Sequence, residues 1–177
     1  MPTTMQLISA QTLTSASASV TFSSIPQTFT DLKLVLSARA NGSSNWQIAL
    51  TQFNTDTTAS NYPSIVLYGF NGSAGSQTAN QWGGGYAPNS TQTANVFSNT
   101  DVYITNYSVN GVSKSVSIDS VAENNSNNLA PQQLSTMRWT GTSPITQIIF
   151  TPDNGNFVAG SSFYLYGISS DTANQNT

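Results

Sequence analysis

The chain has 177 residues, 37% of them hydrophobic and only 6% charged, with a formal net charge of −3. This length and apolar fraction suit one domain with a real core, although the charge lies far below the roughly 25% of typical globular proteins. The four Lys and Arg residues are scattered, and no apolar run approaches the roughly 18 residues of a membrane span. We therefore expect neither nucleic-acid binding by phosphate neutralisation nor a membrane-spanning role.

The N-terminal part of the chain alternates apolar and polar residues, the pattern of half-buried strands. It begins with neither a basic region nor a long apolar stretch, so we expect no secretory signal. Leu32, Leu34 and Leu36 share one face of the third predicted strand. Lys33 and Arg39 point the other way. The first five strands are predicted at 7–13, 19–22, 31–40, 46–53 and 64–70.

The fourth and fifth of these strands differ in pattern. Trp46, Ile48 and Leu50 share one face of the segment 46–53, and we expect Trp46 in the core. The segment 64–70 is a nearly continuous apolar run, which is typical of a central strand.

The C-terminal part adds strands at 101–107, 113–121, 144–152 and 157–168, and Trp139 is expected in the core. Asn110-Gly111, between two alternating runs, favours a tight hairpin because Asn and Gly reach positive φ values easily. With about nine to ten strands and no amphipathic helix, the sequence predicts an all-β, jelly-roll-like two-sheet antiparallel sandwich. We expect a single domain over 1–168 and a polar tail over 169–177.

Two stretches depart from alternation and are predicted to be long loops, at 72–95 and 123–136. The first contains Trp82 and Tyr86 in a glycine-rich run, and the second contains Asn124 and Asn125. Packing within the loop is the commonest reason for such aromatic residues. Among functional roles, a subunit interface is favoured over stacking on a sugar. We therefore predict these four residues as an interface or glycan-contact surface.

The sequence holds little that could carry catalysis, because it contains neither histidine nor cysteine. Ser-His and Cys-His triads and most zinc sites are thereby excluded. Asp119 and Glu123 could form a carboxylate pair of the kind that cleaves glycosides, but two solvated charges near a strand end explain them more simply. The segment 153–156 resembles the start of a calcium loop without its completing acidic residue, and a hairpin turn explains it. We expect no enzyme activity, no cofactor and no metal.

Two segments of the chain have a specific sequence character: LISAQTLTSASASVTFSSIPQTFTDLKLVLSARA at 7–40 and GNFVAGSSFYLYGI at 155–168. Both segments resemble the corresponding ends of small virion proteins of tailed bacteriophages. It implies a jelly-roll domain that sits on the virion as a trimer or other oligomer. It supplies no catalytic or ligand-binding residue.

The resemblance implies a capsid decoration or cement protein, located on the virion and made in the host cytoplasm. Its expected partners are the major capsid protein and further copies of this chain. The alternative is a tail-fibre or baseplate module that recognises a host surface glycan through Trp82, Tyr86 and the Asn-rich loop. The chain has no long shaft segment, which favours the capsid over the fibre.

Overall fold

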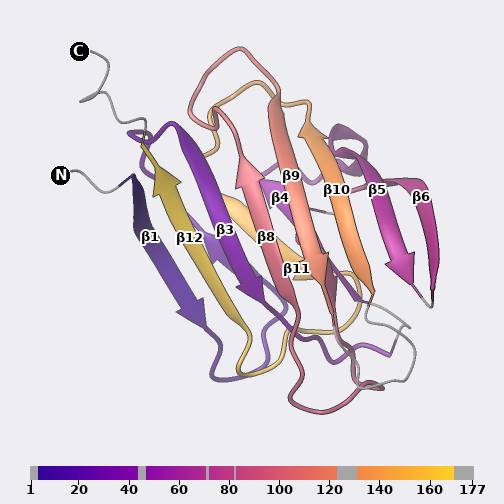
Figure 1. Cartoon of the computed structure of the whole chain (residues 1–177). Coiled ribbons are helices and arrows are strands. Elements are labelled where there is room, and N and C mark those ends of the chain that lie inside the picture. The colour runs from indigo at the N-terminus through magenta and orange to yellow at the C-terminus, as the bar shows by residue number, and fades with distance from the viewer. Residues whose placement is uncertain (1–3, 44–46, 71, 82, 123–130, 170–177) are drawn as a thin grey trace.

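The computed structural model describes residues 4–43, 47–70, 72–81, 83–122 and 131–169 (Figure 1). These residues form twelve strands and one short 3-10 helix, η1. The large sheet has the strand order β1-β12-β3-β8-β9-β10-β5-β6, and the small sheet has the order β2-β11-β4-β7. The elements are β1 Met5–Thr12, β2 Val20–Phe22, β3 Asp31–Ser37, β4 Gln47–Phe53, η1 Ala59–Asn61, β5 Pro63–Phe70, β6 Ser73–Asn80, β7 Tyr86–Ala87, β8 Asn99–Ile104, β9 Lys114–Val121, β10 Gln132–Trp139, β11 Ile148–Pro152 and β12 Ser162–Ile168.

The two sheets lie face to face, with the small sheet behind the large one in Figure 1. The neighbouring strands are antiparallel, which confirms the predicted all-β two-sheet sandwich. The predicted number of strands was too low. β6 and β7 lie in the stretch 72–95, and β10 begins in the stretch 123–136, both predicted as loops. These strands were missed because small and polar residues occupy many of their positions, so hydrophobic alternation is weak.

Alternation produces the core, because residues two apart along a strand face the same side of a sheet. Leu32, Leu34 and Leu36 are at most 1% exposed, as predicted for β3. Trp139, also predicted in the core, is 3% exposed and packs edge-on against Phe53 at 5.7 Å between ring centroids. The other large side chains that fill the space between the sheets include Phe22, Val102, Ile104, Val116, Ile118, Ile148, Phe150, Phe157, Phe163 and Leu165.

The buried face of β4 is the opposite of the one suggested by its apolar residues. Ala49, Thr51 and Phe53 are at most 1% exposed, whereas Leu50 is only half-buried. The large ring of Phe53 is buried in the core. Because side chains two positions apart in a strand face the same side of the sheet, Ala49 and Thr51 also point inward. Trp46 and the side chain of Ile48 lie outside the described residues.

The predicted turns are partly correct. β8 and β9 pair with each other as neighbours, but nine residues, 105–113, connect them instead of a two-residue turn. A tight connection occurs between β5 and β6, where Phe70 faces Ser73. The predicted hairpin at 153–156 is wrong, because β11 belongs to the small sheet and β12 to the large one. That segment therefore crosses between the sheets.

Arg39 does not point to solvent, as alternation predicts, but is 8% exposed. β3 ends at Ser37, so the period of the strand no longer applies at this position. The guanidinium donates to the carbonyl oxygens of Gln92 at 2.9 Å and Thr93 at 2.6 Å. These hydrogen bonds therefore hold the segment before β8 against Arg39.

Of the tail predicted over 169–177, only Ser169 lies among the described residues.

Candidate binding surface

Of the four predicted contact residues, only Tyr86 lies among the residues that the structure describes. Trp82, Asn124 and Asn125 lie outside the described residues. Tyr86 is half-buried in β7, where its backbone N–H donates to Ser120 Oγ at 3.0 Å. Burial raises the pKa of the Tyr86 phenol, with a smaller contribution from Tyr68. Tyr86 therefore forms part of the sandwich and not of an exposed recognition loop.

The glycines at 83–85, directly before Tyr86, are buried. Gly84 N–H donates to the carbonyl of Ala49 at 2.8 Å, and Ala49 N–H donates to the carbonyl of Gly85 at 2.9 Å. A Cβ at Gly84 would lie 2.5 Å from the Cβ of Ala49. Glycine is thus required by close approach of the backbone to β4, not by flexibility for binding.

Exposed aliphatic residues gather instead on the outer face of the large sheet. Ile65, Leu67 and Leu134, which we call the outer patch, are 59%, 55% and 58% exposed. Leu134 of β10 lies directly opposite Leu67 of β5, and Ile65 is two residues before Leu67 on the same face. Side chains in such positions touch, so the outer patch is contiguous.

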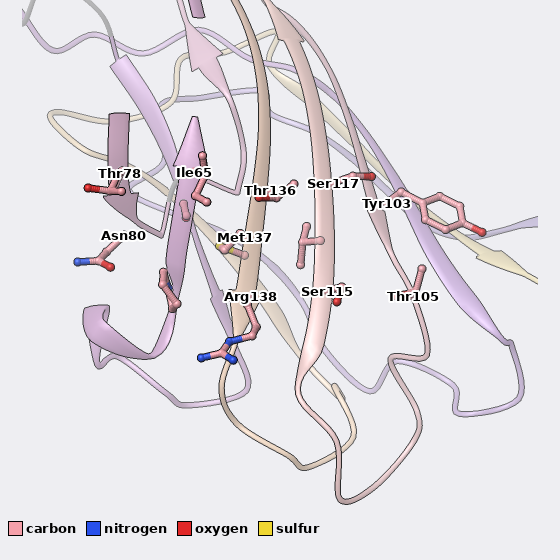
Figure 2. A pocket seen from close by; sticks show the side chains of 14 residues that line it. Ile65, Thr78, Asn80, Tyr103, Thr105, Ser115, Ser117, Thr136, Met137 and Arg138 are labelled. Atoms are coloured by element: carbon pink, nitrogen blue, oxygen red, sulfur yellow. The ribbon is translucent and has the colours of Figure 1, made fainter. Parts of the chain in front are cut away.

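The surface around the outer patch is hollowed. One hollow of about 660 Å³ is lined by Ile65 together with hydroxyl, amide and guanidinium side chains. Figure 2 shows Ile65, Thr136, Ser117 and Tyr103 in a row on neighbouring strands, with Arg138 at one end of the hollow. A second hollow, of about 460 Å³, shares part of this lining and contains all three outer-patch residues.

Three charged side chains, Lys33, Asp101 and Asp119, line the second hollow beside the outer patch. Asp101 of β8 lies directly opposite Asp119 of β9, and Asp119 lies opposite Leu134. Lys33 Nζ lies 3.3 Å from Asp101 Oδ2. Asp119 has no hydrogen bond or ion pair within the part of the chain that the structure describes. Like charges opposite one another on a sheet are unfavourable, and the ammonium group of Lys33 beside Asp101 offsets part of this repulsion.

Tyr103 is held in a fixed orientation at the edge of the larger hollow. Its hydroxyl donates to Asp31 Oδ2 at 2.8 Å, and Asp31 Oδ1 accepts the backbone N–H of Asn106 at 2.8 Å. The hydrogen bond to Asp31, followed by burial, raises the pKa of the Tyr103 phenol. The ring is therefore positioned before any ligand arrives.

The candidate catalytic and calcium residues gain no support. Asp119 is exposed on the outer face, and Glu123 lies outside the described residues. In the segment 153–156, the backbone N–H of Asn156 donates to Asn41 Oδ1 at 2.8 Å, which ties the turn to the loop after β3. The described residues contain no group of three or more acidic side chains that could hold a metal ion.

The outer patch was missed from the sequence although a signal was present. The run at 64–70 is apolar at successive positions, so one of its faces must point away from the core unless both faces are covered. The run was predicted as a central strand. β5 lies one strand in from the edge strand β6, and its outer face is open.

No helix among the described residues is long and apolar enough to cross a membrane. Comparisons of the chain with protein-family models, with curated proteins and with solved structures find no match.

Proposed function

We propose that this chain is a structural protein of a bacteriophage virion, without enzyme activity, that binds the capsid shell through the outer patch. The outer patch carries the proposal, because contiguous exposed aliphatic residues mark protein interaction surfaces. The likeness of residues 7–40 and 155–168 to phage virion proteins supplies the location. The expected partner presents aliphatic side chains to Leu67 and Leu134.

The chemistry of the patch favours a protein partner over a glycan. Ile65, Leu67 and Leu134 are branched aliphatic side chains, which fill pockets on another protein, whereas sugar rings stack best on flat aromatic rings. Each contact is small, but a capsid binds many copies by symmetry, so weak contacts act together. Bridging of neighbouring capsid subunits would then help the head resist the pressure of its DNA.

The test uses particles of the phage that encodes the chain, stripped of this protein and incubated with purified chain. We expect the wild-type chain to bind and to raise the temperature at which DNA is released. Leu134→Lys places a charge in the centre of the outer patch and should abolish both effects. Val112→Lys is the matched control, because Val112 is also exposed, at 45%, but lies in the loop before β9.

Equal binding by Leu134→Lys and the wild-type chain would contradict the proposal, as would DNA release at an unchanged temperature. A glycan-array signal that survives Leu134→Lys, from a chain that does not bind stripped particles, would replace the capsid role with host recognition.

A further inference from the structure

Among the described residues the two sheets end in four edge strands, and of these only β6 is long and regular. β2 has three residues and β7 has two. β1 has eight residues, but its register shifts between Leu7 and Ser9. β6 also has eight residues, and all of them pair with β5 in unbroken register. Short length and bulges are devices by which proteins stop edge strands from pairing with other chains, and β6 has neither.

The sequence of β6 also lacks two further protective devices, charged residues and proline. The segment 73–80 reads SAGSQTAN. At Gly75, a Cβ would lie 2.6 Å from the hydroxyl oxygen of Tyr68, so the Tyr68 side chain occupies the space that a larger residue would need. β6 therefore presents an uncharged edge at one side of the large sheet (Figure 1).

The hydrogen-bond pattern identifies the groups that face outward. Gln81 N–H donates to the carbonyl of Tyr62 at 3.0 Å, which makes these residues a hydrogen-bonded pair. Bonded and non-bonded pairs alternate along an antiparallel ladder. Ala74, Ser76, Thr78 and Asn80 therefore direct their N–H and C=O groups away from β5. No described residue bonds to the outward backbone groups of Ala74, Ser76 or Thr78.

We infer that β6 pairs with β6 of a second copy of this chain, antiparallel, across a two-fold axis at Gln77. This register places Ser76 opposite Thr78 and Ala74 opposite Asn80, so every outward-facing residue finds a partner. It brings no charges together, because the strand has none. A second copy fits this edge because antiparallel pairing about a two-fold axis matches each donor with an acceptor automatically.

The pairing has a consequence for the outer patch. Antiparallel strands in one sheet are related by an axis perpendicular to the sheet, so both outer faces point the same way. Ile65 and Leu67 lie on β5, one strand in from the joined edge. The dimer thus presents two outer patches on one side and binds a repetitive surface with greater avidity than one copy does. The pairing itself does not depend on the proposed function.

The test uses single cysteines, because the chain has none. In the proposed register the two Gln77 residues form a non-bonded pair, whose Cα atoms lie about 4.5 Å apart. This separation suits a disulfide. We expect Gln77→Cys to form a covalent dimer under mild oxidation. Ser117→Cys, exposed in the middle of the large sheet, should remain monomeric under the same conditions.

Sedimentation of the cysteine-free chain provides the second measurement. We expect the average mass to rise with concentration toward that of a dimer. Gln77→Lys should restore the monomer mass, because it places two like charges next to each other at the two-fold axis. Gln77 lies opposite the buried Val66, on the other face of the sheet from Ile65, so this variant leaves the outer patch unchanged. A monomer at every concentration, or equal cross-linking of Gln77→Cys and Ser117→Cys, would overturn the inference. If Gln77→Lys still binds stripped particles, the capsid proposal stands independently of this contact.

Discussion

At the scale of single residues, Asp56 connects three parts of the fold. Its carboxylate accepts hydrogen bonds from Trp139 Nε1 at 2.8 Å, Asn61 Nδ2 at 2.9 Å and the Thr58 N–H at 3.0 Å. Its backbone carbonyl accepts the Tyr62 hydroxyl at 2.8 Å, and burial raises the pKa of that phenol to about 12. Partial burial alone would raise the pKa of Asp56, but the donors from Trp139, Asn61 and Thr58 lower it overall.

The lowered pKa of Asp56 makes stability depend on pH. A carboxyl group whose pKa is lower in the folded state stabilises the protein above the unfolded value of about 3.9, and this stabilisation is lost as pH falls through the folded pKa. We expect Asp56→Asn to reduce the slope of unfolding free energy against pH in this acidic window, measured by urea denaturation. At neutral pH, Asp101→Asn, which removes one exposed ion pair, should lower the free energy of unfolding by less than Asp56→Asn does. Equal slopes in Asp56→Asn and the wild-type chain would contradict this account.

At the scale of elements, the backbone at 83–85 extends the small sheet alongside β4 without being a regular strand. The Cβ of an alanine at Gly84 would meet both the Cβ of Ala49, at 2.5 Å, and its carbonyl oxygen, at 2.6 Å. Backbone and a short, rigid side chain cannot move aside, so β4 and this segment would separate. Gly69 in β5 differs, because its nearest neighbour is the flexible side chain of Gln132 at 3.2 Å.

We therefore predict opposite outcomes for two glycine substitutions. Gly84→Ala should lower the free energy of unfolding by about 1–3 kcal/mol, the usual cost of overpacking. Gly69→Ala should be neutral or stabilise by up to about 1 kcal/mol, because alanine restricts the unfolded chain more than glycine does. Chemical denaturation measures both. Equal destabilisation by the two variants would show that close approach at Gly84 is not the cause.

At the scale of the whole molecule, the two faces of the large sheet have different roles. Leu34 faces the small sheet and is fully buried, whereas Leu134 is 58% exposed on the outer face. The inner face stabilises the fold, and the outer face is open to a partner. Such a division is usual when one sheet is larger than the sheet that covers it.

Stability measurements can separate these roles. Leu34→Ala should cost about 2–5 kcal/mol, because it leaves a cavity in the core. Leu134→Ser should change the free energy of unfolding by no more than about 0.5 kcal/mol, because the side chain is already largely in water. Thermal and urea unfolding of both variants provides the test. A large loss in Leu134→Ser would mean that the outer patch serves the fold and not a partner.

Much of the fold was predictable where alternation was strong. The strands predicted at 31–40 and 157–168 contain β3 and β12, although each real strand is shorter, and Leu34 and Phe163 face inward and are fully buried. β10 was missed, because Gln133 and Ser135 face inward and are paired with each other by a hydrogen bond of 2.7 Å. Hydrophobic periodicity cannot detect a strand whose buried face carries polar side chains. Such side chains can be buried where they find hydrogen-bond partners, and the location of those partners depends on the tertiary structure.

The sequence by itself determined the all-β class and the alternating pattern of the clearest strands, and it excluded catalytic sites that need His or Cys. These properties depend on local residue order and composition. Only the tertiary structure decided which face of each strand is covered. Apolar residues at 64–70 look the same in a central strand and in one with an open face. The small sheet covers the large one on one side only, and this long-range arrangement exposes Ile65, Leu67 and Leu134 as the candidate binding surface.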